Sequence, residues 1–168
     1  MSSSPSSTLP DVLPVGLRLV ICGTAASPES ARKRQYYAGP GNRFWAILHE
    51  TGITDCRLEP KDFERLAEFG VGLTDVMKSQ SGIDSDVDFT LFDSEAFSAR
   101  ILTARPRVLC FNGKKAAQVA LRRRTVDYGD LGEKIGGTHL FVAPSTSGLA
   151  ARWWNASVWS DLAELILE

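Results

Sequence analysis

Short apolar runs that end in glycine or in a turn-forming segment constrain the fold of this chain more than any other feature. RLVICG lies at 18–23, RVLCFNG at 107–113 and HLFVAPS at 139–145, and the short segment GVGLTD at 70–75, which contains two glycines, is predicted to be a strand or a tight loop. Apolar runs of this kind are typical of strands that are buried on both faces of a sheet. Because helix-like segments separate the runs, the sequence predicts an α/β fold: a three-layer α/β/α domain with a short central, mostly parallel sheet.

The helix-like segments are recognised by apolar residues at helical spacing and by glycine or proline at their ends. The predicted helices cover 42–51, 60–69, 93–104, 114–124 and a last segment that holds Trp159, Leu162 and Leu165. The polar stretch 78–88 is predicted to be a surface loop. Residues 1–14 are rich in Ser and Pro, so we predict a disordered tail there and a single domain over 15–168.

The composition excludes several classes of protein. With 168 residues, of which 43% are apolar, the chain can form one core but not two. Its net charge of -1 gives no overall basic field, so any contact with nucleic acid has to be local. No apolar run is long enough to span a bilayer, and we expect a soluble, cytoplasmic monomer without a membrane partner. The 3 cysteines lack Cys-x-x-Cys spacing, so we predict free thiols, no metal and no cofactor.

Four loops follow the predicted strands and are expected to meet, because the carboxyl ends of parallel strands lie at one edge of a sheet. They are GTAAS at 23–27, TD at 74–75, FNGK at 111–114 and APSTSGLAAR at 143–152. GTAAS is small and uncharged, which lets a ligand approach the backbone, although a tight strand exit has the same composition. It lacks the glycine spacing of dinucleotide-binding and phosphate-binding loops, which disfavours a nucleotide cofactor.

The run QYYAGPGNRFW at 35–45 is the most informative connection. It combines two tyrosines, a Gly-Pro-Gly turn and an asparagine that enters a helix. We predict that Tyr37 stacks on a planar ring, a contact that stabilises single-strand complexes by about 1–3 kcal/mol per base. The alternatives are a half-buried tyrosine without a ligand and, for Asn42, a plain helix cap.

Together, these segments resemble the uracil-DNA glycosylase superfamily, nearest its mismatch-specific uracil/thymine branch and its hypoxanthine branch. The resemblance rests on YYAGPGNRFW at 36–45, GVGLTDVMK at 70–78, FNGK at 111–114 and APSTSGLAAR at 143–152, in this order. It covers most of the chain. It implies a monofunctional DNA-repair enzyme that extrudes uracil or another deaminated base from DNA and hydrolyses the base–sugar bond, leaving an abasic site.

Two residues depart from the family pattern. In the mismatch-specific branch an asparagine of the first loop positions the attacking water, and Ala25 stands at that place here. In the uracil-specific branch a histidine precedes Pro-Ser, and this chain has Ala143. Three interpretations stay open: an inactive binder of damaged or abasic DNA, an enzyme in which another polar residue orients the water, and one that relies mainly on departure of the base. A hydrolase of free nucleosides is disfavoured, because it would not need the loop at 143–152.

Asn42 and Asp75 are the two candidate catalytic residues that orient the water. The resemblance favours Asn42, because the hypoxanthine branch also lacks the first-loop asparagine and carries one in its Asn-Arg-Phe-Trp segment. Asp75 falls where thymine-excising relatives have an asparagine that touches base or water; a turn cap is the alternative. An ionised carboxylate only accepts hydrogen bonds, so Asp75 is predicted to select bases with a ring N–H, such as uracil, hypoxanthine and xanthine, over cytosine and adenine.

The other predicted site residues lie in the same loops. The base-binding residues are Gly23, Thr24, Ala25, Ala26, Tyr37, Asp75 and Asn112. Backbone N–H groups of 24–27 are expected to receive the negative charge that develops on the departing base. The DNA-binding residues are Lys114, Ser145, Thr146, Ser147, Gly148, Leu149 and Arg152. Here the hydroxyl groups are assigned to phosphates, Leu149 to an apolar wedge that fills the gap in the duplex, and Arg152 to the opposite base or the backbone.

Overall fold

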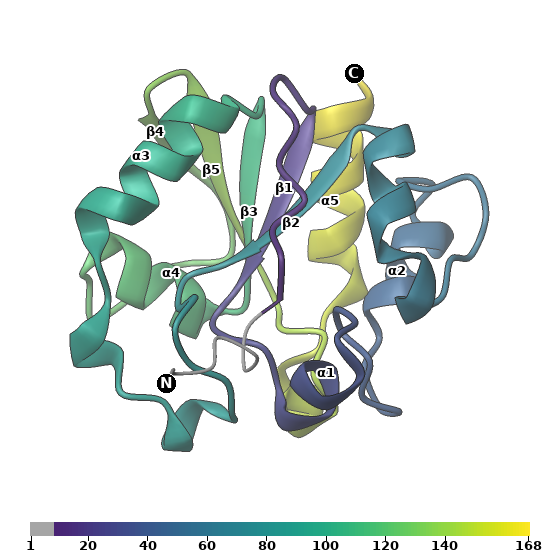
Figure 1. Cartoon of the computed structure of the whole chain (residues 1–168). Helices are drawn as coiled ribbons and strands as arrows, with labels where there is room; N and C mark the ends of the chain where they lie inside the picture. The colour runs from purple at the N-terminus through teal and green to yellow at the C-terminus, as the bar shows by residue number, and fades with distance from the viewer. Residues whose placement is uncertain (1–8) are drawn as a thin grey trace.

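A five-stranded sheet forms the centre of the computed structural model, which describes residues 9–168 (Figure 1). The strands are β1 (Leu19–Gly23), β2 (Val71–Asp75), β3 (Val108–Asn112), β4 (Gly129–Ile135) and β5 (Thr138–Ala143). Their order is β2-β1-β3-β5-β4. All neighbours are parallel except β4, which pairs with β5 in the antiparallel sense. The predicted short, mostly parallel sheet is confirmed.

Helices cover both faces of the sheet and complete the three predicted layers (Figure 1). The α-helices are α1 (Pro28–Lys33), α2 (Phe44–Glu50), α3 (Ser94–Ala104), α4 (Lys114–Leu121) and α5 (Ala156–Leu167). The 3-10 segments are η2 (Pro60–Phe69), η3 (Asp84–Asp86), η4 (Phe89–Leu91) and η5 (Gly148–Trp153). Side chains of α2, η2 and α5 pack on one face of the sheet, and side chains of α3 and α4 pack on the other.

Alternate residues of each strand supply the two halves of the core. In β1, Ile21 packs in the half that contains Trp159 of α5, whereas Val20 packs in the half that contains Phe97 of α3. A strand covered on both sides therefore needs apolar residues at successive positions. Full burial of one such side chain contributes about 1.5–3 kcal/mol. This is why the strand runs are recognisable in the sequence.

The strand order opens a crevice at one edge of the sheet. After β1 the chain passes to α1 and α2 on one face, and after the neighbouring β3 it enters α4 on the other face. The loops that leave β1 and β3 therefore turn away from each other. Open α/β sheets bind their ligands in the crevice that forms at such a point.

Three elements differ from the sequence prediction. The strand β4 is absent from the prediction because its sequence GDLGEKI alternates half-buried and exposed positions and contains no apolar run. As an antiparallel edge strand it needs only one covered face. The helix α1 is also absent, because 6 residues show little periodicity. The segment that begins at Pro60 is helical as predicted, but it is a 3-10 helix.

Residues 9–14 correct the prediction of a disordered tail over 1–14. Leu9 and Val12 are 3% and 9% exposed, and Val12 exchanges two backbone hydrogen bonds of 2.9 Å with Leu73 of β2. The composition of this segment does not predict that it packs on the domain. When the backbone of a segment pairs with a strand, a few apolar side chains are enough to hold it there. The part of the predicted tail at 1–8 lies outside the described residues.

Candidate active site

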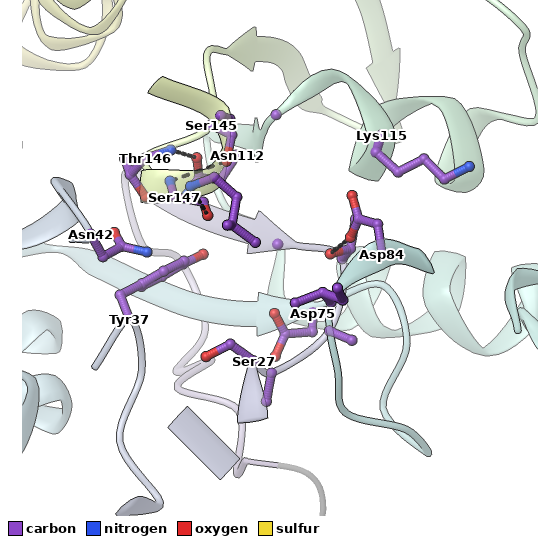
Figure 2. Close-up of a pocket in the computed structure, with 18 of the residues that line it drawn as sticks. Ser27, Tyr37, Asn42, Asp75, Asp84, Asn112, Lys115, Ser145, Thr146 and Ser147 are labelled. Atoms are coloured by element: carbon purple, nitrogen blue, oxygen red, sulfur yellow. Dashed lines mark hydrogen bonds between the residues drawn. The ribbon is translucent and has the colours of Figure 1, made fainter. Parts of the chain in front are cut away.

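A cavity of about 610 Å³ lies at the carboxyl ends of β1, β2 and β3 (Figure 2). This volume is within the range of small-molecule sites, about 300–1,000 Å³. The four loops that were predicted to meet all contribute to its walls. The predicted residues that line it are Gly23, Thr24, Ala25, Ala26, Tyr37, Asn42, Asp75, Asn112, Lys114, Ser145, Thr146, Ser147 and Leu149. Gly148 and Arg152 lie outside its lining.

Gly23, the last residue of β1, lets two polar groups approach the backbone closely. A methyl group on its Cα would lie 3.0 Å from Oδ1 of Asp75 and 3.2 Å from the hydroxyl oxygen of Tyr37. The carbonyl of Gly23 accepts a hydrogen bond of 2.8 Å from the N–H of Val76, which ties the first loop to the end of β2. Glycine is needed here for space, because any side chain would displace Asp75 or Tyr37.

Tyr37 lines the cavity with one face of its ring already covered. The ring of Phe44 stacks on it, with centroids 4.0 Å apart and planes inclined by 21°. Tyr37 has a φ of 53°, a left-handed conformation that bulky residues rarely adopt and that is often found at functional sites. Its hydroxyl oxygen is buried and makes no hydrogen bond within residues 9–168, and burial raises the pKa of the phenol well above its ordinary value. Because Phe44 covers one face of the ring, any stacking ligand has to use the opposite face.

Asn42 lies directly before the N-cap residue of α2, Arg43, and lines the cavity. Its Oδ1 accepts a hydrogen bond of 3.0 Å from the N–H of Phe44 in the first turn of α2. Because Arg43 is the N-cap residue and α2 has no side-chain cap, the bond of Asn42 is a local contact before the helix and not an N-cap. The bond fixes the amide and leaves one lone pair of Oδ1 and the Nδ2 donors for a ligand. Figure 2 shows Asn42 beside Tyr37, on the side of the cavity away from Lys115.

Asp75, the last residue of β2, brings a buried carboxyl to the cavity wall. The residue is 4% exposed, and burial raises the pKa of its carboxyl from 3.8 to about 6, while the Lys78 ammonium at 3.8 Å acts in the opposite direction. Among residues 9–168 no donor forms a hydrogen bond with either carboxyl oxygen, so the turn-cap alternative is not observed. At neutral pH the group is largely an ionised acceptor that faces the cavity.

Asn112 and Thr146 are bound to each other across the cavity wall (Figure 2). The Nδ2 of Asn112 donates to the Thr146 hydroxyl at 3.0 Å, and the Thr146 N–H donates to Oδ1 of Asn112 at 3.1 Å. Thr146 is completely buried, so its hydroxyl joins the end of β3 to the loop after β5 instead of reaching a phosphate as the sequence suggests. The Asn112 amide is likewise engaged within the protein.

The loop after β5 forms the rim of the cavity. Leu149 and Trp153 are 77% and 55% exposed, and both line the opening. Gly148 packs on Gly41, where a Cβ on Gly148 would lie 3.2 Å from the carbonyl oxygen of Gly41. This contact joins the rim to the loop that carries Tyr37. Arg152 does not enter the cavity and lies over the Trp153 ring, 4.7 Å from its centroid.

The comparisons with known proteins agree with this geometry. A profile of the uracil DNA glycosylase superfamily matches residues 10–163. The chain belongs to this superfamily. Its fold is similar to the solution NMR structure of a candidate uracil DNA glycosylase from Methanosarcina acetivorans, with a TM-score of 0.66 and 28% identity, over 97% of this chain and 99% of that chain. The resemblance drawn from the four sequence motifs is confirmed.

The two departures from the superfamily motifs have different surroundings. Ala25 lines the cavity, so a methyl group occupies the place at which the mismatch-specific branch of the uracil DNA glycosylase superfamily has an asparagine. Ala143 is completely buried within the core that contains Trp159, and it does not line the cavity. Core packing therefore fills the place of the superfamily histidine.

One wall of the cavity is not apparent from the sequence, even for a member of the uracil DNA glycosylase superfamily. The hydroxyl of Thr24 donates to Asp84 at 2.9 Å, and the N–H of Gly82 donates to the Ala26 carbonyl at 2.8 Å. These bonds hold part of the predicted surface loop 78–88 against the first loop. Lys115 and Tyr128 line the cavity as well. No motif marks these residues, because they come from separate polar stretches.

In the described part of the chain, no group of three or more His, Cys, Asp or Glu side chains is arranged to hold a metal ion. None of the helices within residues 9–168 combines the length and apolar character that a membrane crossing requires. Cys22, Cys56 and Cys110 are free thiols, as predicted.

Proposed function

We propose that this protein is a DNA glycosylase that extrudes uracil and other deaminated bases from DNA and hydrolyses the base–sugar bond. The observation that carries the proposal is the ionisable carboxyl of Asp75, which lies against Gly23 beside the Tyr37 hydroxyl and has no hydrogen-bond donor of its own among residues 9–168. A buried carboxylate without donors is unfavourable unless a ligand supplies one. A base that carries a ring N–H is such a ligand.

Base selection follows from the chemistry of that acceptor. Uracil, hypoxanthine and xanthine present a ring N–H beside a carbonyl, whereas cytosine and adenine present a lone pair at the corresponding ring nitrogen. A carboxylate accepts from the first group and repels the lone pair of the second. The free face of Tyr37 supports stacking of the extruded base. Excision of deaminated bases is expected to decline as the pH falls below about 6, where Asp75 becomes protonated and loses its role as an acceptor.

The hydrolytic step needs an oriented water and a place for the charge of the leaving base. The bond between the base nitrogen and the anomeric carbon breaks with its electron pair going to the base, and the water supplies the new sugar hydroxyl and the proton that the base takes up. The free lone pair of Asn42 Oδ1 is the acceptor we assign to the water. Backbone N–H groups of 24–27 are assigned to the developing negative charge, since preorganised donors typically contribute several kcal/mol.

A catalytically inactive binder of damaged or abasic DNA is the second candidate. The observation that favours it is Ala25, whose methyl group lines the cavity and cannot orient a water molecule. Such a protein would use the same cavity and rim but would leave the base–sugar bond intact.

Incubation with modified DNA separates the two candidates. The protein is incubated with duplexes that contain uracil, hypoxanthine, xanthine, or only normal bases, and the DNA is then treated with alkali to break abasic sites. We expect breaks at the deaminated positions, and at least about tenfold slower excision by Asn42→Ala and by Asp75→Ala, equivalent to about 1.4 kcal/mol of barrier. Retention of the modified duplex without any breaks would support the binder and overturn the proposed enzyme.

Asn155→Ala is the matched control for Asn42→Ala. Asn155 is the N-cap of α5 and accepts a hydrogen bond of 3.0 Å from the N–H of Ser157, two residues ahead, as Asn42 accepts one from Phe44, but Asn155 lies outside the cavity. Loss of the Asn155 cap costs about 0.5–2 kcal/mol of stability. A defect in excision that appears only in Asn42→Ala therefore reports on the water. Equal defects in both variants would assign the effect to the lost backbone hydrogen bond before each helix.

A further inference from the structure

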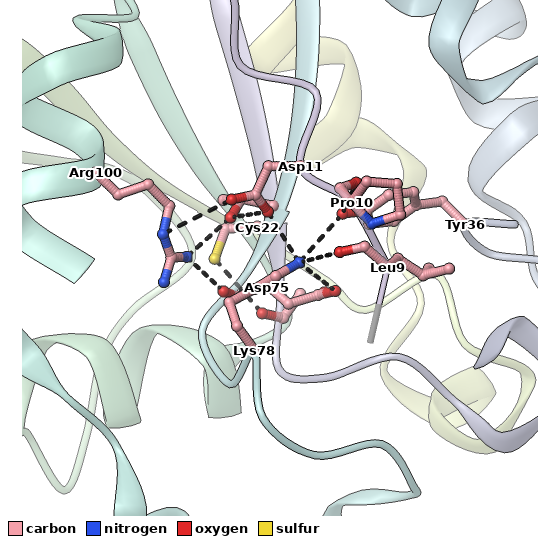
Figure 3. Close-up of polar contacts among 10 residues, drawn as sticks. Leu9, Pro10, Asp11, Cys22, Tyr36, Asp75, Lys78 and Arg100 are labelled. Atoms are coloured by element: carbon pink, nitrogen blue, oxygen red, sulfur yellow. Dashed lines mark hydrogen bonds and ion pairs between the residues drawn. The ribbon is translucent and has the colours of Figure 1, made fainter. Parts of the chain in front are cut away.

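The N-terminal segment places a second carboxylate directly behind the cavity. Asp11 lies beside β2, and its Oδ1 accepts a hydrogen bond of 2.8 Å from the hydroxyl of Thr74, the residue before Asp75 (Figure 3). Asp11 and Asp75 therefore flank the same end of β2. Asp11 is separated from Thr74 by 63 positions in the sequence, and no motif connects them.

Lys78 lies between these two carboxylates and is much closer to Asp11 than to Asp75. Its Nζ is 2.8 Å from Oδ1 of Asp11 and donates to the Leu9 carbonyl at 2.8 Å and to the Tyr36 hydroxyl at 3.5 Å. The distance from Nζ to Oδ2 of Asp75 is 3.8 Å, which is too long for a hydrogen bond. Three partners thus lie closer to this ammonium group than the Asp75 carboxyl does. Lys78 therefore stabilises Asp75 through its charge without covering its oxygens.

Arg100 of α3 is kept away from the Asp75 carboxyl in a similar manner. Its Nη1 donates to the Thr74 hydroxyl at 2.9 Å and to the backbone carbonyl of Asp75 at 2.7 Å, and its Nε lies 3.8 Å from Oδ2 of Asp11. Figure 3 shows Arg100 and Lys78 approaching Asp11 from opposite sides. Both cations of the cluster thus contact Asp11 or the backbone, and the carboxyl of Asp75 is left for the cavity.

We propose that Asp11 is a positioning residue for base recognition, because by holding the Lys78 ammonium it leaves both carboxyl oxygens of Asp75 free to accept a hydrogen bond from the base. This inference rests on the proposed function and extends it to the N-terminal segment. Without the charge of Asp11, the nearest carboxylate for Lys78 is Asp75. A small rotation of the lysine side chain would then give Asp75 a donor from the protein in place of one from the base.

The charges around Asp75 determine in which direction its pKa changes when Asp11 is neutralised. The groups that face it are Asp11 from the N-terminal segment, Cys22 of β1, Tyr36 and Tyr37 from the loop after α1, Lys78 after β2, and Arg100 of α3. Burial raises the pKa of Cys22, Tyr36 and Tyr37, so these three are uncharged at neutral pH. Asp11 raises the pKa of Asp75, whereas Lys78 and Arg100 lower it. Neutralising Asp11 therefore moves the titration of Asp75 to lower pH.

The experiment compares Asp11→Asn, Lys78→Met and the double variant with the parent chain. Asparagine at 11 keeps an oxygen for the Thr74 hydroxyl, and the backbone pairing of Val12 with Leu73 does not depend on the side chain, so the segment is expected to stay in place. Asp161→Asn, on the exposed side of α5, is the control for loss of one negative charge.

Two readouts are used, and one of them does not depend on activity. The first is the rate of uracil excision as a function of pH. The second is the titration of the Asp75 carboxyl carbon, followed by NMR in protein labelled with ¹³C-aspartate and assigned by its absence in Asp75→Asn. We expect Asp11→Asn to excise uracil about tenfold more slowly at neutral pH, the effect of a lost charge-assisted hydrogen bond, and to titrate Asp75 at lower pH than the parent.

The remaining variants distinguish positioning from a loss of structure. Lys78→Met removes the nearby cation, so Asp75 should titrate at higher pH, and the double variant should recover most of the excision rate that Asp11→Asn loses. An unchanged Asp75 titration in Asp11→Asn, or a double variant no faster than Asp11→Asn, would overturn the inference. A parent chain that excises none of the bases would refute the proposed function, and the NMR titration would still decide whether Asp11 controls Asp75.

Discussion

At the scale of the single residue, the carboxyl of Asp75 is the group whose burial has the clearest energetic consequence. An increase in its pKa from 3.8 to about 6 corresponds to about 3 kcal/mol of free energy. Because the folded chain binds this proton more tightly than the unfolded chain, stability falls as the pH rises between these values. The unfavourable contribution is absent below about pH 4 and complete above about pH 6.

Replacement of Asp75 by asparagine should therefore stabilise the protein at neutral pH. We expect Asp75→Asn to raise the free energy of unfolding by up to about 3 kcal/mol near pH 7.5 and to give no gain near pH 4. Urea unfolding at both pH values measures the difference, with Asp161→Asn as the control. A variant that is less stable than the parent near pH 7.5 would contradict this assignment of charge.

Gly23 illustrates what a sequence conveys about a single residue and what it does not. The glycine at the end of an apolar run correctly predicts the end of a strand. Its spatial role, however, depends on Asp75 and Tyr37, which approach it from other parts of the chain. Asn42 is a similar case, because the sequence leaves a cap and a ligand as alternatives, whereas in the structure Arg43 is the N-cap residue and Asn42 lies on the cavity wall.

At the scale of the element, the sequence predicted best those segments that are buried on both sides. The strands β1, β3 and β5 are continuous apolar runs, and the segment that forms β2 was recognised as a strand or tight loop. The edge strand β4 was missed because half of its positions contact solvent. The segment η5 has no apolar periodicity, so the sequence does not indicate that Trp153 is exposed.

The 3-10 segment η5 gives a prediction about DNA binding. Trp153 is 55% exposed at the rim of the cavity, whereas Trp45 and Trp159 are 5% and 0% exposed. We expect a base that flanks the extruded nucleotide to stack on Trp153, so an abasic-site duplex should quench the tryptophan fluorescence. Trp153→Ala should bind this duplex at least about fivefold more weakly, since stacking contributes about 1–3 kcal/mol per base.

Trp153→Phe and Trp154→Phe complete the test of the rim. Phenylalanine at 153 keeps a stacking surface and removes the fluorescent ring, so binding should persist while the quenching disappears. Trp154→Phe should leave both largely unchanged. Equal affinities of Trp153→Ala and the parent chain would show that this ring does not contact DNA.

At the scale of the whole molecule, the charge distribution predicts how DNA binding depends on salt. The net charge is -1, and the cations near the cavity are few: Lys114 and Lys115 line it, and Arg152 lies on the rim. Three phosphate contacts would give a slope of about -3 for log K against log salt. Fluorescence anisotropy with an uncleavable duplex between about 50 and 200 mM salt measures this slope.

Lys114→Ala tests whether the salt dependence arises at the cavity. Removal of one phosphate contact should reduce the slope by about 1. A slope steeper than about -6 in the parent chain would require further cations at the interface and would contradict a contact confined to this rim.

The assembly of the cavity was predictable only in outline. The four loops are expected to meet because the carboxyl ends of parallel strands lie at one edge of a sheet, and the parallel sheet follows from the sequence pattern. The charged group behind the cavity was not predictable, because Asp11, Lys78 and Arg100 lie in a presumed tail, a polar loop and a helix that share no motif. Such contacts depend on the three-dimensional path of the chain.

The pairing of Val12 with Leu73 also has a consequence for handling the protein. It pairs with the outer edge of β2, an edge strand that would otherwise present unpaired N–H and C=O groups to solvent. Exposed edge strands can pair with strands of other molecules and promote aggregation. A shortened chain that starts at Leu17, where the apolar pattern begins, would lose this protection. Expression of the protein should therefore retain everything from Leu9 onward.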